Sequence, residues 1–257
     1  GCLIEGEIMS DVAAIILAAG QGTRMASDRA KVLHEISGKP MIHYVVETVR
    51  QVVDDIVVVV GHQREAVKST LAVYPQVRFA VQEEQLGTGH AVMAALPELS
   101  RDTSDVVILC GDTPLIRVET LGTLIEGHRT VGRSLSLLVT SLDNPHGYGR
   151  VVTDVEGRLM RIVEESDASD VERRVSTVNT GTYCVKVSLL QRFLPALDSE
   201  NVQGEFYLTD VIAQAYDEDL PAAMVSAETA TEVLGVNTQE DLVTVEHLLR
   251  TVERQVL

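Results

Sequence analysis

Continuous apolar stretches alternate along this chain with stretches whose apolar residues recur at helical spacing. The continuous stretches are rich in β-branched residues and span 12–19, 55–60 and 105–110. Such runs are typical of strands that are buried on both faces of a sheet. Helical spacing predicts helices at 41–53, 64–72 and 88–96. The alternation predicts a three-layer α/β fold with a largely parallel mixed sheet, and such sheets bind ligands at the carboxyl ends of their strands.

The pattern changes after residue 142, where turns and short strand-like segments replace the long apolar runs. We expect a β-rich insertion at about 142–185 that covers one rim of the sheet. Helical patterns resume at 186–197 and 207–216, a strand is predicted near 222–226, and residues 239–257 are expected to form a last helix. The main domain would then span 9–238. Residues 1–8, which precede Met9, are interpreted as an extension or an expression remnant.

The chain is strongly acidic, with a formal net charge of −17 over 257 residues. That charge disfavours nonspecific binding to nucleic acid or to an anionic membrane, so neither is an expected partner. The sequence has no apolar run of the ~18 residues that span a membrane, and it has no signal-peptide pattern. Its three cysteines have no C-x-x-C spacing and indicate neither a disulfide framework nor a zinc site. We therefore expect a cytoplasmic protein.

One segment reverses the sign of the charge. Between residues 20 and 40, four cations (Arg24, Arg29, Lys31 and Lys39) stand against only two anions. They follow a glycine turn, Gly20-Gln21-Gly22, whose backbone N–H groups can approach a phosphate without a Cβ in the way. A solvated loop is the plainer interpretation of the charges alone. A local excess of cations beside glycines is also what an anionic ligand requires.

The glycine turn fits neither of two common phosphate-binding motifs. A dinucleotide fingerprint requires a third glycine where this chain has Met25. A P-loop ending at residues 37–40 would have Leu33 in place of its first glycine and Pro40 in place of its hydroxyl residue. A dinucleotide-dependent oxidoreductase and a P-loop enzyme are therefore disfavoured.

Five stretches together carry a resemblance to a known family. They are "LAAGQGTRM" at 17–25, "KVLHEISGKPMI" at 31–42, "QLGTGHA" at 85–91, "GDTPL" at 111–115 and "GEFYLTD" at 204–210. In this order they resemble the sugar-nucleotide pyrophosphorylases, and within them the N-acetylglucosamine-1-phosphate uridyltransferases. The resemblance covers nearly the whole chain. It implies a Rossmann-like nucleotidyltransferase fold with a sugar-binding insertion, and an Mg²⁺-dependent enzyme that converts UTP and N-acetylglucosamine 1-phosphate into UDP-N-acetylglucosamine and pyrophosphate for cell-wall biogenesis.

The resemblance also implies roles for residues of this chain. Arg24 and Lys31 would be catalytic cations that neutralise phosphates, and Asp112 would be catalytic and ligate Mg²⁺ together with Asn237. The sugar phosphate would contact Gly149, Glu164, Asn179 and Asn237. The nucleotide would contact Leu17, Ala18, Ala19, Gly20, Gly22, Thr23, Gln82, Gly87, Thr88, Cys110 and Gly111.

Plainer interpretations stand beside several of these roles. Helix or turn capping would account for Thr88, Asp112 and Asn237, and Lys39 either binds substrate or only closes its loop. For Gln82, an amide can pair with two positions on a base edge at once, which would select uracil.

Some features depart from the family pattern. Ala30 stands where a proline usually precedes the lysine, and Cys110 stands where a tyrosine is common, which brings loop rigidity and nucleotide affinity into question. Bifunctional relatives continue into a left-handed β-helix domain with acetyltransferase activity. This sequence has no hexapeptide repeats of that kind, so we expect either a stand-alone enzyme or a truncated one. The oligomeric state is left open.

Other functions stay open at this point. One is a related nucleotidyltransferase that uses another nucleotide or sugar, such as dTTP with glucose 1-phosphate. Another is a non-catalytic nucleotide-sensing module, which would bind UTP without releasing pyrophosphate. The seven histidines form no H-x-H or H-E-x-x-H motif, so His34, His62 and His90 are interpreted as structural.

Overall fold

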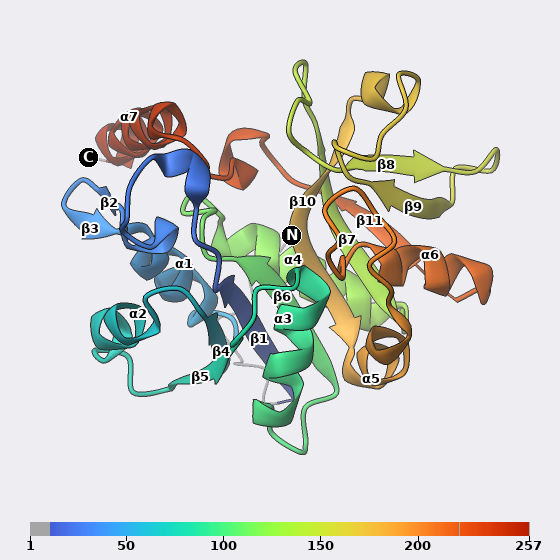
Figure 1. The fold of residues 1–257 in the computed structure, drawn as a ribbon, viewed down its shortest axis with the longest axis horizontal. Helices are drawn as coiled ribbons and strands as arrows, with labels where there is room; N and C mark the ends of the chain where they lie inside the picture. The colour runs from blue at the N-terminus through green and yellow to red at the C-terminus, as the bar shows by residue number, and fades with distance from the viewer. Residues whose placement is uncertain (1–10, 221, 257) are drawn as a thin grey trace.

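The computed structural model describes residues 11–220 and 222–256 of the chain. The expected extension at 1–8, Met9 and Cys2 lie outside the described residues. Two layers of helices enclose a mixed, mostly parallel sheet, so the predicted three-layer α/β architecture is confirmed (Figure 1). No helix among the described residues is both long enough and apolar enough to cross a membrane.

Three of the four strands in the parallel half of the sheet are those that the apolar runs predict, and β5 is the fourth. β1 pairs in parallel with β4 on one side and with β6 on the other, and β4 pairs in parallel with β5. The carboxyl ends of these strands therefore meet at one edge of the sheet. The four strands are β1 (Val12–Ala18), β4 (Asp55–Val60), β5 (Val77–Val81) and β6 (Asp105–Cys110).

The other half of the sheet has mixed directions. β10 lies between β6 and β7 and is antiparallel to both, while β11 pairs in parallel with β7. The sequence pattern predicts the residues of β10 within the β-rich insertion. Most of this strand belongs to the central sheet, and only Val178 near its start pairs with the insertion, through Arg150. The three strands are β7 (Leu135–Ser141), β10 (Thr177–Lys186) and β11 (Ala222–Ser226).

Helices pack on both faces of the sheet and form two apolar cores. Apolar residues of α1, α2, α4 and α7 pack with Ile16 of β1, whereas those of α3, α5 and α6 pack with Ile15. One strand serves both cores because successive side chains point to opposite faces. Figure 1 shows α3 in front of the sheet and α4 behind it. The helices are α1 (Met41–Val49), α2 (Arg64–Leu71), α3 (Thr88–Ala95), α4 (Val118–Thr130), α5 (Val187–Phe193), α6 (Asp210–Asp217) and α7 (Gln239–Val256).

A small lobe extends from the start of β10. Its strands, β8 (Arg150–Thr153) and β9 (Leu159–Val163), form an antiparallel pair against which α6 packs. The Arg150 side chain is 2% exposed and pairs with Glu165 at 2.7 Å, which ties the lobe together from inside. In Figure 1 the lobe lies on the opposite side of the molecule from α7 and from the short pair β2 (Glu35–Ile36) and β3 (Lys39–Pro40).

Short 3₁₀ helices complete the described fold, and two of them hold Arg24 and Lys31, two of the four cations in the segment 20–40. They place Arg24 and Lys31 next to the carboxyl end of β1. Gly22 precedes the first of them with φ of 68°, and a Cβ at this position would lie 2.6 Å from Lys31 Cβ, so the close approach requires glycine. The 3₁₀ helices are Thr23–Met25, Lys31–Leu33, Leu96–Glu98, Glu172–Arg174, Leu194–Ala196 and Thr231–Val233.

Candidate active site

Two adjoining pockets open at the carboxyl ends of the parallel strands. The first, the turn pocket, has a volume of about 400 Å³ and is bounded by the glycine turn, Lys31 and the start of α3. The second, the lobe pocket, has a volume of about 220 Å³ and lies between the end of β6, the small lobe and the loop before α7. Leu17, Thr88, Cys110 and Asp112 line both pockets, so the two cavities share a wall.

The residues predicted to contact nucleotide and sugar separate between the two pockets. Those that line the turn pocket are Leu17, Ala18, Ala19, Gly20, Gly22, Thr23, Lys31, Gln82, Gly87, Thr88, Cys110 and Asp112. Besides the shared wall, the lobe pocket is lined by Arg24, Gly149, Glu164, Asn179 and Asn237. Gly111 lines neither pocket. Its N–H donates to the Leu17 carbonyl at 2.9 Å, and a Cβ there would lie 2.7 Å from Ile42 Cδ1, so packing accounts for this glycine.

Three polar side chains gather around Asp112 of the shared wall: Lys31 from the turn pocket, and Arg24 and Asn237 from the lobe pocket. Lys31 Nζ donates to a carboxylate oxygen of Asp112 and, at 3.1 Å, to Oδ1 of Asn237. Arg24 donates to the same Asn237 oxygen at 3.0 Å. The side chains of Lys31 and Asp112 are 18% and 15% exposed, so solvent screens their attraction only weakly. The fold thus brings all the predicted catalytic and metal-ligating residues to the place where the two pockets meet.

Helix capping accounts for neither Asp112 nor Asn237. At the start of α7, Thr238 Oγ1 accepts the Asp241 N–H at 3.1 Å, and the Asp241 carboxylate accepts the N–H groups of residues 237 and 238 at 2.8 Å each. The side chain of Asn237 is therefore left to face Lys31. Asp112 begins no helix, and its backbone carbonyl accepts the Val236 N–H at 2.9 Å, which ties the loop after β6 to the loop before α7.

The loop that leads into Lys31 is held by Gln63, which precedes α2. Gln63 Nε2 donates to the Asp28 carbonyl at 2.6 Å, and its Oε1 accepts the Ala30 N–H at 2.9 Å. Gln63 has φ of 51°, a left-handed conformation that costs a non-glycine residue about 1 kcal/mol or more. Ala30 has φ of −52°, which proline also adopts. The contact from Gln63 therefore supplies a restraint at the position where family members usually have proline.

Two of the four cations in the segment 20–40 face away from the pockets. Lys39 pairs with Glu47 of α1 at 2.7 Å. Arg29 pairs with Glu35 at 3.1 Å. The interpretation of Lys39 as a residue that closes its loop therefore fits the structure better than contact with substrate, and the local excess of positive charge reaches the pockets through the other two cations.

Gln82 lines the turn pocket directly after β5. Its side chain is buried, and Nε2 donates to the Gly87 carbonyl and to His90 Nδ1, each at 3.0 Å. Both amide N–H groups are thus used within the protein, so a ligand meets one acceptor rather than the two pairing groups that the sequence predicts. The capping interpretation of Thr88 is wrong, because its Oγ1 accepts the Leu208 N–H at 3.0 Å and no side chain caps α3.

Glu164 is the acidic group of the lobe pocket. Burial, reinforced by neighbouring carboxylates, raises the pKa of Glu164, while the Thr209 hydroxyl donates to its Oε1 at 3.1 Å and partly offsets that rise. Gly149 packs directly against it. A Cβ at Gly149 would lie 2.8 Å from Ile162 Cγ2 and 3.3 Å from Glu164 Oε2. The absence of a side chain at 149 therefore keeps the carboxylate accessible from the pocket.

Asn179 and Cys110 complete the walls of the lobe pocket. Asn179 donates to the Tyr183 hydroxyl at 2.9 Å and accepts the Gly181 N–H at 2.8 Å, so one amide N–H and one oxygen lone pair remain for a ligand. Burial raises the pKa of Cys110 to about 12, so its thiol stays neutral and forms an uncharged part of the wall. The replacement of the usual tyrosine therefore adds no charge beside Asp112.

Comparison with known proteins places this geometry in a family. The family model of the MobA-like NTP transferase domain matches residues 14–177, which carry the glycine turn, Lys31 and Asp112. The chain belongs to this NTP transferase family. Bifunctional protein GlmU from Geobacter metallireducens is 47% identical over 235 residues, which cover 91% of this chain and 49% of that protein. Bifunctional protein GlmU from Desulfotalea psychrophila is 44% identical over 240 residues, which cover 93% of this chain and 70% of that protein.

The NTP transferase chain spans about half the length of the first of these relatives. Among solved structures, the 4-diphosphocytidyl-2C-methyl-D-erythritol synthase from Anaerococcus prevotii superposes with a TM-score of 0.66 at 17% sequence identity. The superposition covers 94% of this chain and 99% of that one. The Rossmann-like fold predicted for the chain is therefore confirmed by structure as well as by sequence.

The donor set of the shared wall fits the Mg²⁺ that the NTP transferase family implies. Oxygen atoms of Asp112 and Asn237 converge on a single cation, the Lys31 ammonium, and carboxylate and amide oxygens are ligands that Mg²⁺ accepts. In the described part of the chain, no group of three or more His, Cys, Asp or Glu side chains is placed to hold a metal. Two protein oxygens suit an ion that takes its other ligands from substrate phosphates and water.

Three residues that the sequence did not single out also line the pockets of this NTP transferase. Tyr148 lines the lobe pocket, where its hydroxyl accepts the Gly235 N–H at 3.5 Å. Thr209 lines the same pocket. Glu205 lines the turn pocket, and burial raises its pKa. The signal was available for two of them, because Glu205 and Thr209 lie within "GEFYLTD".

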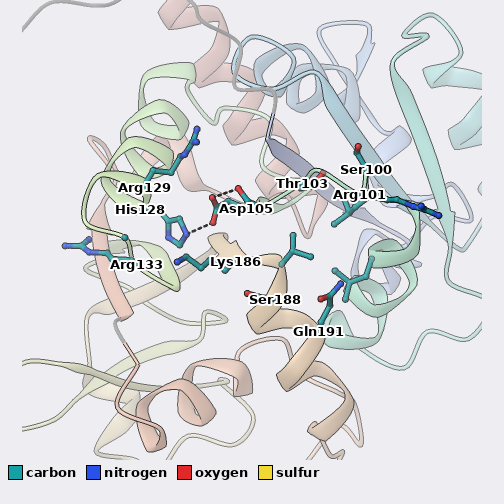
Figure 2. Close-up of a pocket in the computed structure, with 15 residues that line it drawn as sticks. Ser100, Arg101, Thr103, Asp105, His128, Arg129, Arg133, Lys186, Ser188 and Gln191 are labelled. Carbon is teal, nitrogen blue, oxygen red and sulfur yellow. Dashed lines mark hydrogen bonds and ion pairs between the residues drawn. The ribbon is translucent and has the colours of Figure 1, made fainter.

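A further cavity, of about 770 Å³, lies at the opposite, amino-terminal end of β6 (Figure 2). There the buried His128 donates through Nε2 to Asp105 at 3.2 Å, and its Nδ1 is hydrogen-bonded to the Ser136 hydroxyl at 2.9 Å. Figure 2 shows that the guanidinium groups of Arg101 and Arg133 point away from each other, so they do not converge on one ligand. The buried His128 therefore has a structural explanation in its hydrogen bonds to Asp105 and Ser136.

Proposed function

We propose that this chain transfers the uridylyl group of UTP to the phosphate of N-acetylglucosamine 1-phosphate, giving UDP-N-acetylglucosamine and pyrophosphate. The observation that carries the proposal is the shared wall. A carboxylate, an amide oxygen and two cations meet where the turn pocket and the lobe pocket join. Two phosphate-bearing substrates in adjoining pockets would bring their reacting groups to that point. The relatives named bifunctional protein GlmU support the family of the reaction.

In the proposed reaction, a phosphate oxygen of the sugar phosphate attacks the α-phosphorus of UTP. A new P–O bond forms as the bond from the α-phosphorus to the bridging oxygen breaks, and that oxygen leaves with pyrophosphate. The attacking oxygen is already anionic, so the protein needs no general base. Its task is to align two anions and to offset their repulsion. Lys31 and Arg24 do this with charge, and the glycine turn offers backbone N–H groups.

Bound Mg²⁺ would add positive charge beside the phosphates and orient them for in-line transfer. Asp112 and Asn237 are the residues that would hold it. Since Lys31 Nζ donates to both of their side chains, its ammonium holds the two oxygens together until phosphates arrive. Lys31 can then donate to a phosphate oxygen instead, because its three N–H bonds rotate freely.

The small lobe is the proposed sugar-binding insertion, at about 142–185. Glu164 accepts from sugar hydroxyls, Asn179 offers its remaining N–H, and Gly149 leaves room for the ring. The described cysteines, Cys110 and Cys184, are free thiols, which supports a proposed location in the reducing cytoplasm.

The test is pyrophosphate release from UTP, measured across several sugar 1-phosphates with and without Mg²⁺. We expect the highest kcat/KM with N-acetylglucosamine 1-phosphate and a loss of turnover when the metal is chelated. Higher kcat/KM with dTTP and glucose 1-phosphate would move the assignment to a related enzyme. Calorimetric binding of UTP without pyrophosphate release for any sugar phosphate would refute a catalytic role.

A further inference from the structure

The orientation of the Gln82 amide in the turn pocket is fixed by two acceptors. The Gly87 carbonyl can only accept, so the atom that faces it at 3.0 Å is the amide nitrogen and not the amide oxygen. Position 87 requires glycine, because its φ is 111° and a Cβ there would lie 2.6 Å from the Phe206 carbonyl. The first helical N–H of α3, from Ala91, bonds the same carbonyl at 3.1 Å. The first acceptor is therefore part of a rigid helix start.

The second acceptor is the His90 ring. Nδ1 of His90 lies 3.0 Å from the same amide nitrogen, which donates and cannot accept. Nδ1 must therefore be the unprotonated nitrogen, and the ring proton must be on Nε2. Both N–H bonds of Gln82 are then occupied. Its Oε1 has no hydrogen-bond donor among the described residues and is the polar atom that Gln82 leaves for a ligand in the turn pocket.

We propose that His90 positions the Gln82 amide so that the turn pocket selects the base of the nucleotide. This proposal rests on the proposed function. Together with Gly87, His90 presents Oε1 of Gln82, an acceptor, to the base. Uracil and thymine carry an N–H at ring position 3, which can donate to this oxygen. Cytosine carries a lone pair at the same position, and two acceptors facing each other repel. The histidine interpreted from sequence as structural thus sets the preference for UTP over CTP without touching the nucleotide.

The test compares two substitutions at His90. His90→Phe keeps a ring but has no acceptor, so one buried N–H of Gln82 loses its partner and the amide is no longer fixed. We expect the ratio of kcat/KM for UTP to that for CTP to fall by about tenfold, which corresponds to ~1.4 kcal/mol. His90→Asn is the matched control, because its side-chain oxygen can replace Nδ1 as the acceptor. It should keep most of the wild-type ratio. A ratio unchanged in folded His90→Phe would overturn the proposal.

Two further measurements separate positioning from a merely structural role. In a Gln82→Ala background, His90→Phe should leave the UTP to CTP ratio where Gln82→Ala alone puts it, because His90 acts only through Gln82. An additional loss of selectivity in the double variant would contradict this. Nitrogen-15 NMR of the wild-type protein reports the tautomer directly and does not depend on any variant folding. It should show the His90 proton on Nε2, and a proton on Nδ1 would sink the proposal.

Failure of this proposal can be told apart from failure of the proposed function. If the wild-type protein turns over no UTP with any sugar phosphate, the function is wrong. If it prefers UTP strongly over CTP and His90→Phe keeps that preference, the function stands and the role of His90 is refuted.

Discussion

Replacement of Asp112 by asparagine tests whether the shared wall is the reacting centre. The substitution keeps the shape of the side chain and removes one negative charge from the place where the two pockets meet. We expect pyrophosphate release to fall by about a hundred- to a thousandfold, while the protein stays folded. Activity should fall more than stability, because the Asp112 charge contributes little to folding and much to stabilising the transition state.

The structure gives the size of each effect. An asparagine oxygen can still accept a hydrogen from Lys31, so folding loses the charge-assisted part of one hydrogen bond, about 1–2 kcal/mol. That is small against a typical total of ~5–15 kcal/mol and lowers Tm by about 2–8 °C in a domain of this size. Loss of one preorganised contact to developing charge costs about 3–4 kcal/mol in the transition state. Activity should therefore fall far more than stability.

Initial rates of pyrophosphate release, with UTP and N-acetylglucosamine 1-phosphate saturating, measure the first effect, and thermal unfolding measures the second. Asp102→Asn is the matched control, because Asp102 is an exposed aspartate at the opposite end of β6 that makes no ion pair among the described residues. It should change neither quantity. A folded Asp112→Asn protein whose rate lies within about fivefold of the wild type would refute the reasoning, since no transition-state contact of ~3 kcal/mol could then reside at this carboxylate.

Three other substitutions test the pocket walls. Gly149→Ala should raise the KM for the sugar phosphate about tenfold and leave the KM for UTP unchanged, because the new methyl would lie 2.8 Å from Ile162 and crowd only the lobe pocket; equal rises in both KM values would contradict this. Glu164→Gln should raise Tm by about 2–4 °C near pH 8 but not near pH 4. Burial raises the pKa of Glu164, so the wild-type protein loses stability as pH rises through that folded-state pKa, whereas glutamine stays neutral. A Tm shift of equal size at both pH values would count against this explanation. Gln63→Ala should lower kcat about tenfold, because it releases the loop before Lys31. Adding Ala30→Pro should restore most of the lost kcat, because proline fixes the φ that Ala30 already has. If the double variant shows no recovery of kcat, loop restraint is ruled out as the cause.

The sequence predicts the parallel half of the fold well for a physical reason. Strands buried on both faces must be apolar throughout, so β1, β4 and β6 stand out as continuous runs and their carboxyl ends locate the ligand-binding edge. The antiparallel half is harder to predict. β10 contains Asn179 and Thr180, whose polar side chains line the lobe pocket and form hydrogen bonds within the protein, and its sequence therefore looks like that of an insertion strand.

The sequence predicts the site residues that lie within family motifs. It does not predict the hydrogen-bond partners of those residues when the partners come from distant loops. Arg24, Lys31 and Asp112 lie within stretches that resemble the family, and the fold brings them together. The internal partners of Gln82 are not visible in the sequence, because nothing in "QLGTGHA" indicates which way the amide of Gln82, three residues before this stretch, turns its nitrogen. Orientation depends on tertiary contacts, so a motif gives the identity of a recognition residue but not the group it presents.

The charges near the site, rather than the net charge of the chain, decide how much positive charge the pockets offer to phosphates. Exposed charges farther away than about 8 Å are largely screened at physiological salt, so the net charge of the whole chain matters little inside the pockets. Nearby, Lys31 is already paired with Asp112. Burial raises the pKa values of the half-buried Glu164 and Glu205, and neighbouring carboxylates add to the rise at Glu164. The walls alone cannot neutralise two phosphate-bearing substrates. We therefore expect part of the positive charge to arrive with them as the proposed Mg²⁺, and the oxygens of Asp112 and Asn237 are the atoms that we propose to bind it.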